Sequence, residues 1–527
     1  PQFSFLLADN HPHVLALPFV MLALGMALNL LLTRRAPTTP ELLFYGLCVG
    51  GLAFLNTWDG PVYLLVFVGA DGVRRLINNA TGRLTRQDWI GVGLLAVLLL
   101  LLTFLLYLPF WLGFRSQAGG VLPNVINPTR TQQLFMMFGP FFLLLPPFLL
   151  VEAWRGGRRM NWSLGIAAAI GLLALLVLAM LVLIVAGALL PGFRNDALAY
   201  IDAAGGLSAL LPVILSRRVE AILTTLLLLV AIVVVVARLF PRHQPGEKRT
   251  VDASGEARVV PYPPATGYAL VLIGLGVFLV LVPEFVYLRD NFGTRMNTIF
   301  KFYYQAWILF SIAGAYGLYS VLADERLRAP SSLVRAAVGV MTLVALGLGL
   351  LYPVLGVYTR MVVETGRLYA VQPDPLTLDG GRTFATLDDY EAIMCLRQVV
   401  EGDSVVVAEA IGPAYRSEYG RVAALTGIPI LLGWENHEGQ WRGATYPQIA
   451  GSRGSDIPRL YDTTPRLDDA QRIINTYGID YVFFGATERA TYGVGAEDKF
   501  RDNLEVVCER GTSRFYRTMP VEVAEAQ

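Results

Sequence analysis

Long apolar runs alternate with short polar loops over the first two thirds of the chain. A helix needs about 20 apolar residues to cross the roughly 30 Å hydrocarbon core of a bilayer. Runs close to that length predict ten membrane spans, at residues 14–33, 42–57, 61–73, 89–112, 134–151, 164–190, 219–237, 267–288, 302–322 and 334–357. The third run is too short to cross alone, so we interpret it as a re-entrant or tilted segment.

The last third of the chain shows a different pattern, in which short apolar runs of strand type alternate with amphipathic stretches. The expected elements are a helix at 388–400, a strand at 404–408, a helix at 467–477 ended by Gly478, a strand at 480–485, and a hairpin of 504–509 with 513–517 across Gly511. This alternation predicts a small α/β domain.

Composition and charge separate the same two parts. Only 16% of the 527 residues are charged, against about 25% in soluble domains. The net charge of +1 is the sum of +9 over residues 1–358 and −8 over residues 359–527. We therefore expect a transmembrane helical domain at 1–358 and an acidic soluble domain at 359–527.

The positive charges also predict an orientation. Alternate loops carry 17 Lys and Arg residues on one side of the predicted spans and 8 on the other. The positive-inside rule places the richer side in the cytoplasm. The chain is thus expected to be a multi-pass protein of the cytoplasmic membrane with an extracytoplasmic C-terminal domain. Residues 241–263, rich in Pro, Gly and charge, are expected to form a flexible linker.

The cysteines and the missing motifs exclude several classes. Cys48, Cys395 and Cys508 lie far apart, which rules out a zinc ribbon or a disulfide scaffold. Cys395 and Cys508 can pair if their domain is extracytoplasmic, although two free buried thiols are the commoner arrangement. Nucleotide and hydrolase signatures are absent, and the acidic domain argues against a nucleic-acid partner. The chain starts at Pro1 without Met or a signal peptide, so we expect residues missing upstream.

Polar clusters on the predicted outer side are candidates for a functional site. Asp9, His11 and His13 share parity, so an extended segment would point them to one face. A divalent metal site or an acid–base cluster requires this arrangement, and His437 of the soluble domain is the further candidate ligand. The alternative is a membrane-boundary loop with capping histidines.

Two further stretches carry catalytic and binding candidates. Asp59, after Trp58, is either a catalytic carboxylate or a helix cap beside an interfacial Trp. Arg295 and Lys301 flank a helix start, which suits a phosphate group as well as a snorkelling pair. Neighbouring candidates for substrate binding are Asp290, Asn297, Tyr303 and Tyr304, although the tyrosines also fit an aromatic belt. Glu284, near the outer end of a span, is a weaker candidate.

The stretch 433–442 places an unusual set of side chains between turn-forming glycines. Its members are Trp434, Glu435, Asn436, His437, Glu438, Trp441 and Arg442. Trp faces stack on sugars, and carboxylates with a His bind cations or move protons, which makes Glu435 a catalytic candidate. The alternative is an exposed loop whose Trp side chains dock on the membrane domain.

Several motifs resemble the YYY membrane protein family (Chlor_Arch_YYY), a polytopic family of unknown function. They are HPHVLALPF at 11–19, NTWDGPVY at 56–63, DNFGTRMNTIFKFYYQAW at 290–307, GWENHEGQWR at 433–442 and GIDYVFFG at 478–485. The family's YYYxG motif is absent, because Phe302-Tyr303-Tyr304 is followed by Gln305. Members of the family are longer, which implies further helices upstream.

The layout also resembles the GT-C superfamily, whose members transfer a sugar from a polyprenyl-phosphate donor. This resemblance implies that Asp9, His11 and His13 form a second acidic patch and that the principal catalytic Asp lies upstream. It also implies that Arg295 and Lys301 hold the lipid phosphate and that residues 434–442 cover the acceptor. The implied partners are membrane lipids, a polyprenyl-phosphate-type ligand, and an upstream portion or partner subunit.

The leading hypothesis is therefore a GT-C-like glycosyltransferase, or the C-terminal portion of one, acting at the outer face of the membrane. The alternative is a non-catalytic scaffold or envelope assembly subunit whose soluble domain binds partners; the incomplete catalytic set favours it. A transporter is the third hypothesis. The span interiors carry almost no charge and no internal repeat is visible, which argues against it.

Overall fold

The computed structural model divides the chain into two compact units, residues 1–371 and 372–527. The sequence predicted a division between 358 and 359. The structure describes residues 2–6, 11–33, 35–79, 81–114, 116, 118–242, 250–251, 257–258, 260–290, 293–364, 381, 385–400, 405–463 and 467–518. Most of the predicted linker at 241–263 lies outside these residues, but within it β2 (Thr250–Val251) pairs antiparallel with β3 (Ala257–Arg258).

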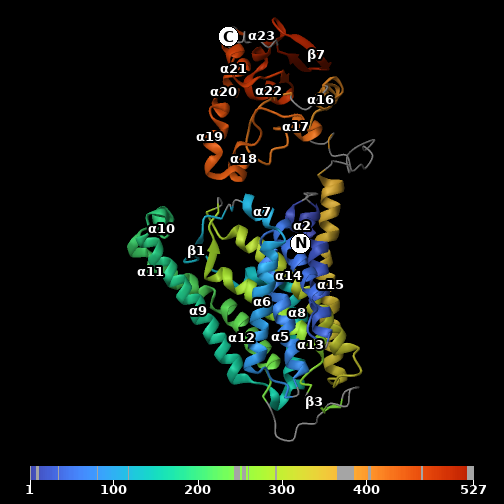
Figure 1. The fold of residues 1–527 in the computed structure, drawn as a ribbon. Helices are drawn as coiled ribbons and strands as arrows, with labels where there is room; N and C mark the ends of the chain where they lie inside the picture. Colours follow the sequence, from blue (N-terminus) through green and yellow to red (C-terminus); the bar gives the residue numbers. More distant parts are fainter. Residues whose placement is uncertain are drawn as a thin grey trace. The chain divides into compact units, whose positions relative to one another are not determined.

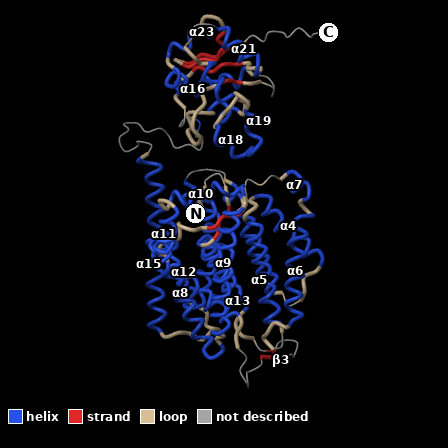
Figure 2. The backbone as a smooth tube through the Cα atoms, turned by 90° about the vertical axis from the view of Figure 1, so that its left-hand side faces the viewer, coloured by secondary structure: helices blue, strands red, loops and turns tan. Residues whose placement is uncertain are grey.

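Every predicted span corresponds to a helix of the first unit, whose long helices run side by side (Figures 1 and 2). They are α3 (Leu17–Leu32), α4 (Thr39–Leu55), α5 (Asp59–Asn78), α6 (Arg86–Leu105), α8 (Thr131–Gly156), α9 (Trp162–Leu189), α12 (Ile222–Leu239), α13 (Pro264–Leu281), α14 (Met296–Leu322) and α15 (Ser332–Tyr358). Of the helices that the structure describes, seven are long and apolar enough to cross a membrane, namely α6, α8, α9 and α12 to α15. The apolar helices α3 and α4 are shorter.

Helix α5 corrects the length of the third predicted segment, although it is not among the described helices that are apolar enough to cross a membrane. The apolar run at 61–73 was too short for a span, but the helix continues to Asn78, for 20 residues. It continues because Asp71 accepts hydrogen bonds from Arg74 at 2.6 Å and from Arg75 at 2.7 Å. These ion pairs compensate part of the charge that ended the apolar run, and the helix runs on without a break to Asn78.

The segment between α9 and α12 is a second correction, because the sequence indicated only a loop there. It contains α10 (Arg194–Ala203) and α11 (Leu207–Glu220), and the helical segments Pro191–Ala203 and Leu207–Glu220 meet at a bend of 75°. The start of α9 lies beside the end of α12, since Asn161 N donates to Ala237 O at 3.0 Å. The chain therefore leaves and returns to the same end of the unit, and α10 and α11 lie at the opposite end (Figure 1).

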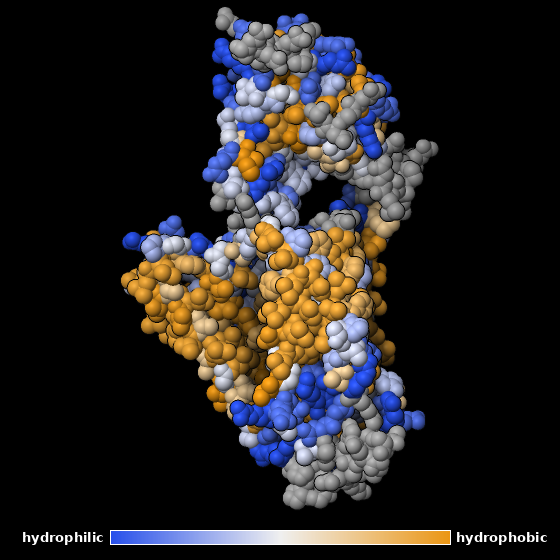
Figure 3. Space-filling model, viewed as in Figure 1, coloured by the Kyte–Doolittle hydropathy of each residue, from blue (hydrophilic) through white to orange (hydrophobic). Residues whose placement is uncertain are grey.

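Buried ion pairs gather at one end of this unit, termed the basic end. Glu152 of α8 accepts from Arg155 at 2.8 Å and from Arg238 of α12 at 3.0 Å, and the pairs of Asp71 lie at the same end. Hydrophilic side chains cover the basic end, whereas the flanks of the helices are hydrophobic (Figure 3). The other end, where α4 stops and α5 and α14 begin, is termed the distal end.

Small residues bring α13 close to its neighbours at the centre of the unit. A Cβ atom on Gly276 would lie 2.4 Å from a ring carbon of Phe310 in α14, and one on Gly267 would lie 2.6 Å from Val73 in α5. Helices within lipid lack a hydrophobic driving force for association, so the van der Waals contacts that this close approach allows hold them together. At the distal end, β1 (Val121–Pro123) pairs antiparallel with β4 (Val286–Leu288). Strand β1 follows the short helix α7 (Leu108–Gly113), and β4 follows α13.

The second unit contains a four-stranded sheet of order β5-β6-β8-β7. Its strands are β5 (Val407–Ala408), β6 (Tyr481–Phe484), β7 (Glu505–Arg510) and β8 (Ser513–Arg517). Strand β6 is parallel to β5 and antiparallel to β8, and the hairpin of β7 and β8 turns at Gly511, which has φ 52°. All four residues of β6 are buried, as expected for a central strand.

Helices cover both faces of this sheet. Tyr481 and Phe483 pack with α16 (Leu387–Val399), whereas Val482 and Phe484 pack with α20 (Arg453–Leu460) and α21 (Leu467–Tyr477). Alternate residues of a strand face opposite sides, so the continuous apolar run at 481–484 serves both cores. Helix α21 has the predicted bounds and is followed by Gly478 at φ 59°.

A disulfide bond joins Cys395 of α16 to Cys508 of β7, across 113 residues of sequence. The sequence had left this pairing open and favoured two free thiols. The remaining cysteine, Cys48 of α4, is free. The bond ties the first helix described in the unit to its last hairpin.

Candidate functional site

A buried carboxylate at the distal end is the centre of the candidate site. Asp59, at the first turn of α5, is only 1% exposed. Its Oδ1 accepts from Gln305 Nε2 of α14 at 2.7 Å and from Asn56 Nδ2 at 3.0 Å. The amide oxygen of Gln305 in turn accepts from the Tyr63 hydroxyl at 2.5 Å. Among the described residues, the second oxygen, Oδ2, has no hydrogen-bond donor.

A cation, Lys301, lies near this carboxylate but forms no ion pair with it in the described part of the chain. Lys301 Nζ stands 5.2 Å from the centre of the Trp58 ring, a cation–π distance. Asp59 and Asp290 are the carboxylates that act electrostatically on Lys301. Asp290 accepts a hydrogen bond from Asn297 Nδ2 at 2.9 Å. The structure thus gathers five of the predicted residues, Trp58, Asp59, Asp290, Asn297 and Lys301, around one end of α14.

Arg295 belongs to a neighbouring cluster rather than to the Lys301 group. Its Nη1 donates to Glu284 Oε1 at 2.8 Å and its Nη2 to Thr129 Oγ1 at 3.0 Å. Glu284, which is fully buried, also accepts from the backbone N–H of Thr129 at 2.7 Å. Tyr303 completes the cluster, with its hydroxyl 3.3 Å from Thr129 Oγ1. Arg295 and Tyr303 therefore join α14 to the segment before α8.

The predicted histidine cluster has a different geometry from the one expected. Helix α2 (Pro12–Leu15) starts directly after His11, because a proline at the first helical position favours a helix start. His11 and His13 are therefore not on one extended segment, although their ring centres lie 4.7 Å apart. His13 Nε2 lies 3.0 Å from Ser4 Oγ, and the ring packs against Tyr304 at 4.6 Å. Asp9 lies outside the described residues.

No group of three or more His, Cys, Asp or Glu side chains suited to a metal ion occurs within the described ranges. His437, the fourth predicted ligand, belongs to the second unit, whereas His11 and His13 belong to the first.

The stretch 433–442 forms a helix, not the predicted loop. Helix α18 (Glu435–Arg442) follows Trp434, and His437 and Trp441 lie one turn apart on it. Trp441 Nε1 donates to His437 Nε2 at 3.1 Å, and Glu438 pairs with Arg442 at 3.5 Å. Helical i, i+4 pairs of this kind explain why a segment rich in turn residues is helical. Glu435 and Asn436 occupy its first turn.

Aromatic rings surround His437. The ring centres of Tyr415 and Trp434 lie 5.6 Å and 5.9 Å from that of His437. Tyr415 and Trp441 are largely exposed, at 71% and 65%. Tyr415 is also the only described non-glycine residue with a positive φ, 64°, a conformation that costs roughly 1–2 kcal/mol. The second unit thus exposes aromatic faces beside the carboxylates of α18.

The sequence analysis did not include Asn56, Tyr63 and Gln305 among the site residues. Asn56 and Gln305 donate hydrogen bonds to Asp59, and Tyr63 donates one to Gln305. The available signal was Gln305, a polar residue in an apolar span one helical turn after Lys301. Its partner Asp59 is 246 positions away in sequence, so only helix packing reveals the contact.

A protein-family model described as an uncharacterized membrane protein (DUF2298) matches residues 1–310. The matched range includes Asp59 and Lys301 and ends before α18. No curated protein and no solved structure matches the chain. Together with the seven long apolar helices, the match identifies a multi-pass integral membrane protein.

Proposed function

The chain belongs to the uncharacterized membrane protein family DUF2298, and we propose that it is a GT-C-like glycosyltransferase, or part of one, that uses a polyprenyl-phosphate sugar donor. The observation that carries this proposal is the meeting of Asp59, Lys301 and Trp58 at the distal end of the helical unit. A lipid-linked sugar presents a phosphate, a sugar face and a hydrophobic tail at the membrane surface. A cation, an aromatic ring and a carboxylate are the groups that bind and activate such substrates.

In this proposal Asp59 is the proton acceptor and Lys301 is the phosphate ligand. Asp59 takes the proton of the acceptor hydroxyl, whose oxygen attacks the anomeric carbon of the sugar. The bond from that carbon to the phosphate oxygen breaks, and its electron pair stays on the lipid phosphate, where Lys301 stabilises the charge. Catalytic hydrogen bonds are often incomplete before substrate binds, which accounts for the second oxygen of Asp59 having no donor among the described residues.

The neighbouring residues have supporting roles. Asn297 holds Asp290 near Lys301, and Gln305 holds the first oxygen of Asp59. We assign Arg295 and Tyr303 to positioning, since both contact Thr129 and Arg295 is paired with Glu284. The aromatic faces at Trp434 and Trp441, beside Glu435, Asn436 and Arg442, form a separate sugar-binding surface on the second unit.

We further propose that the distal end faces the outside of the cytoplasmic membrane. The buried and exposed arginines at the basic end fit the positive-inside rule. Helix α15 starts at the basic end, so the chain leaves the helical unit at the distal end. The disulfide of the second unit supports an extracytoplasmic location, because disulfides persist in oxidising compartments.

A divalent metal ion remains a proposed cofactor, with Asp9, His11 and His13 as candidate ligands in the helical unit and His437 as a separate candidate ligand in the second unit. The closeness of the His11 and His13 rings supports it.

The test is sugar transfer in liposomes that contain the full chain and radiolabelled undecaprenyl-phosphate hexoses, with and without EDTA. We expect Asp59→Asn to lower transfer by about 100-fold or more, as loss of a general base does. Lys301→Gln should raise the apparent KM for the donor and lower kcat, because Lys301 binds the phosphate and stabilises the charge that it gains in the reaction. Arg130→Gln removes another cation of the distal end, one that forms a half-exposed pair with Glu220, and should leave transfer unchanged.

Equal transfer by Asp59→Asn and wild type would refute the assignment of Asp59. Transfer by neither protein with any donor tested would favour the non-catalytic scaffold. Unchanged transfer in EDTA would remove the metal from the proposal while leaving the roles of Asp59 and Lys301 intact.

A further inference from the structure

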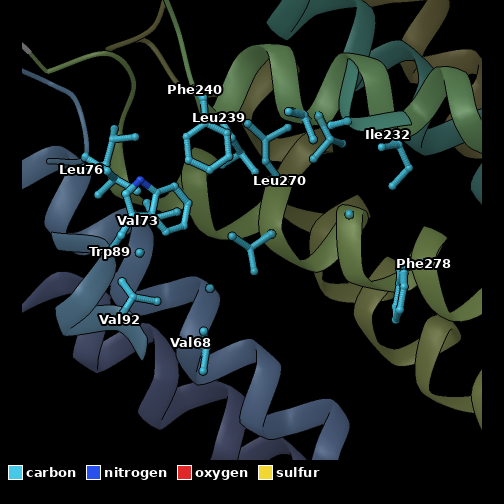
Figure 4. A pocket seen from close by; sticks show the side chains of 18 of the residues that line it. Val68, Val73, Leu76, Trp89, Val92, Ile232, Leu239, Phe240, Leu270 and Phe278 are labelled. Atoms are coloured by element: carbon cyan, nitrogen blue, oxygen red, sulfur yellow. The ribbon is translucent and has the colours of Figure 1, made fainter. Parts of the chain in front are cut away.

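An apolar groove lies on the helical unit, away from the Asp59 site. It has a volume of about 410 Å³ and is formed by α5, α6, α9, α12 and α13 (Figure 4). All of its lining residues are apolar, aromatic or glycine, and they include Val68, Leu76, Trp89, Ile232, Leu239 and Phe278. Its volume is in the range of ligand sites, and four of the five helices that form it are both long and apolar enough to span the membrane. An apolar chain from the bilayer is the kind of group that such a groove accommodates.

One end of the groove lies at the basic end of the unit. There Trp89, at the start of α6, stacks on Phe240, just after α12, with 6.2 Å between ring centres. Trp89 is more than half exposed, as expected of a side chain at the membrane–water interface. The groove therefore runs from the interface toward the middle of the bilayer.

Arginines flank this end of the groove. Arg86 precedes Trp89 by one helical turn and is exposed. Arg242 follows Phe240 by two residues, and its Nε donates to Asn161 Oδ1 at 3.1 Å. Basic side chains next to grooves between membrane helices bind anionic headgroups, and a guanidinium matches a phosphate in geometry. Charge complementarity therefore selects an anionic lipid as the occupant.

We propose that this groove binds an anionic phospholipid of the phosphatidylglycerol type, with one acyl chain between the helices and its phosphate at Arg86 and Arg242. The site is separate from the proposed transferase site, because Asp59 lies at the other end of α5. It does not depend on the proposed function.

The groove can be closed by a single substitution. Gly72 lines it, and a Cβ atom at this position would meet no other atom within 4 Å. A Gly72→Leu side chain would therefore occupy the groove without displacing the backbone. Gly93 of α6 is a matched control, since it also has open space around its Cβ position but does not line the groove.

The experiment is native mass spectrometry of the full chain in detergent, with phosphatidylglycerol and phosphatidylcholine of identical chains added in turn. Each arginine near a headgroup contributes about fivefold in affinity. We expect wild type to prefer phosphatidylglycerol, and Arg86→Gln and Arg242→Gln each to lower that preference about fivefold. Arg158→Gln, an exposed arginine of the basic end that does not border the groove, should leave the preference unchanged.

Gly72→Leu should abolish retention of phosphatidylglycerol, whereas Gly93→Leu should retain it. Equal retention of the two lipids by wild type would overturn the proposal, as would normal retention by Gly72→Leu. The arginine variants keep the proposal testable if Gly72→Leu does not fold, because both arginines lie at the surface.

Discussion

The two oxygens of Asp59 have different surroundings, and this difference bears on function. Both amide donors, from Asn56 and Gln305, reach Oδ1. A buried polar atom without a partner costs roughly 1–3 kcal/mol and calls for a structural or functional explanation. Tyr63 fixes the orientation of Gln305, so the carboxylate is held from one side only. A substrate hydroxyl would complete its hydrogen bonding.

A second buried charge cluster, in the C-terminal unit, has no access to solvent. Arg421 contacts three carboxylates: Glu409 at 3.2 Å, Asp389 at 3.3 Å, and Glu488. These four side chains are at most 2% exposed. Three acidic groups around one guanidinium leave an excess of negative charge. Burial, reinforced by the charge of Glu488, raises the pKa of Glu409 to about 8.

This raised pKa predicts a stability that depends on pH. The unfolded chain releases the Glu409 proton near its ordinary pKa of 4.5, whereas the folded chain keeps it until about pH 8. The stability that protonated Glu409 contributes is therefore complete below pH 4.5. It falls by up to about 1.4 kcal/mol per pH unit as the pH rises from 4.5 toward 8, and it is lost once the pH has passed 8. We expect Glu409→Gln to remove this loss. The protection of the β6 amides against hydrogen exchange, measured in the intact protein at pH 5, 6.5 and 8, reports this loss of stability.

Glu418→Gln is the matched control, because Glu418 is near the surface and pairs with Arg416. Its exchange should follow wild type across this pH range. If wild type and Glu409→Gln lose protection in parallel from pH 5 to 8, Glu409 is ionised in the folded state and the prediction is wrong.

Sequence patterns made Asp59 and Lys301 candidates but gave no indication of the polar network around Asp59. The NTWDG and FKFYYQ stretches are local, and a carboxylate or a cation at a span end is visible in them. The partners Asn56 and Tyr63 are amide and hydroxyl side chains that local patterns do not distinguish from ordinary interfacial residues, and Gln305 stands out only as a polar residue within an apolar span. Their roles come from the packing of α4, α5 and α14.

The disulfide between α16 and β7 should stabilise the C-terminal unit. Cross-linking residues 113 positions apart restricts the unfolded chain, and such bonds contribute about 2–4 kcal/mol. We expect the double substitution Cys395→Ser and Cys508→Ser to lower the free energy of unfolding of this unit by that amount. Urea-dependent protease cleavage within residues 372–527 of the membrane-embedded protein measures the change.

Cys48→Ser, at the free cysteine of α4, is the control and should leave the urea midpoint of the C-terminal unit unchanged. Reducing agent should reproduce the effect of the double substitution in wild type and have no effect on the double variant. An unchanged midpoint in the double variant would contradict the prediction.

Long elements were predictable from the sequence, and elements that depend on charge pairing were not. The hydrophobic runs gave helices for all ten predicted spans, and the helix at 467–477 has its predicted bounds. The run at 61–73 looked too short because Asp71, Arg74 and Arg75 interrupt the apolar pattern, and only their mutual pairing shows that the helix continues. Helix α18 was read as a loop because its glycines and polar residues resemble a turn.

At the scale of the whole molecule, the near-zero net charge conceals two opposite contributions. The helical unit carries its arginines mainly at the basic end, while the acidic excess lies in residues 359–527. Charge counting along the chain therefore predicts both the division of the chain and an orientation in the membrane. It does not predict the groove, since its lining comes from five helices.

The orientation of the protein in the membrane can be tested without any substrate. In a Cys48→Ser background, single cysteines are introduced by Val494→Cys in the C-terminal unit and by Arg83→Cys at the basic end. Both positions are exposed, so both thiols should react with a maleimide reagent once the membrane is broken. In intact spheroplasts a membrane-impermeant maleimide should label Val494→Cys and leave Arg83→Cys unlabelled, because the positive-inside rule retains the basic end in the cytoplasm. The reverse labelling would place Asp59 and Lys301 on the cytoplasmic side and would exclude sugar transfer at the outer face.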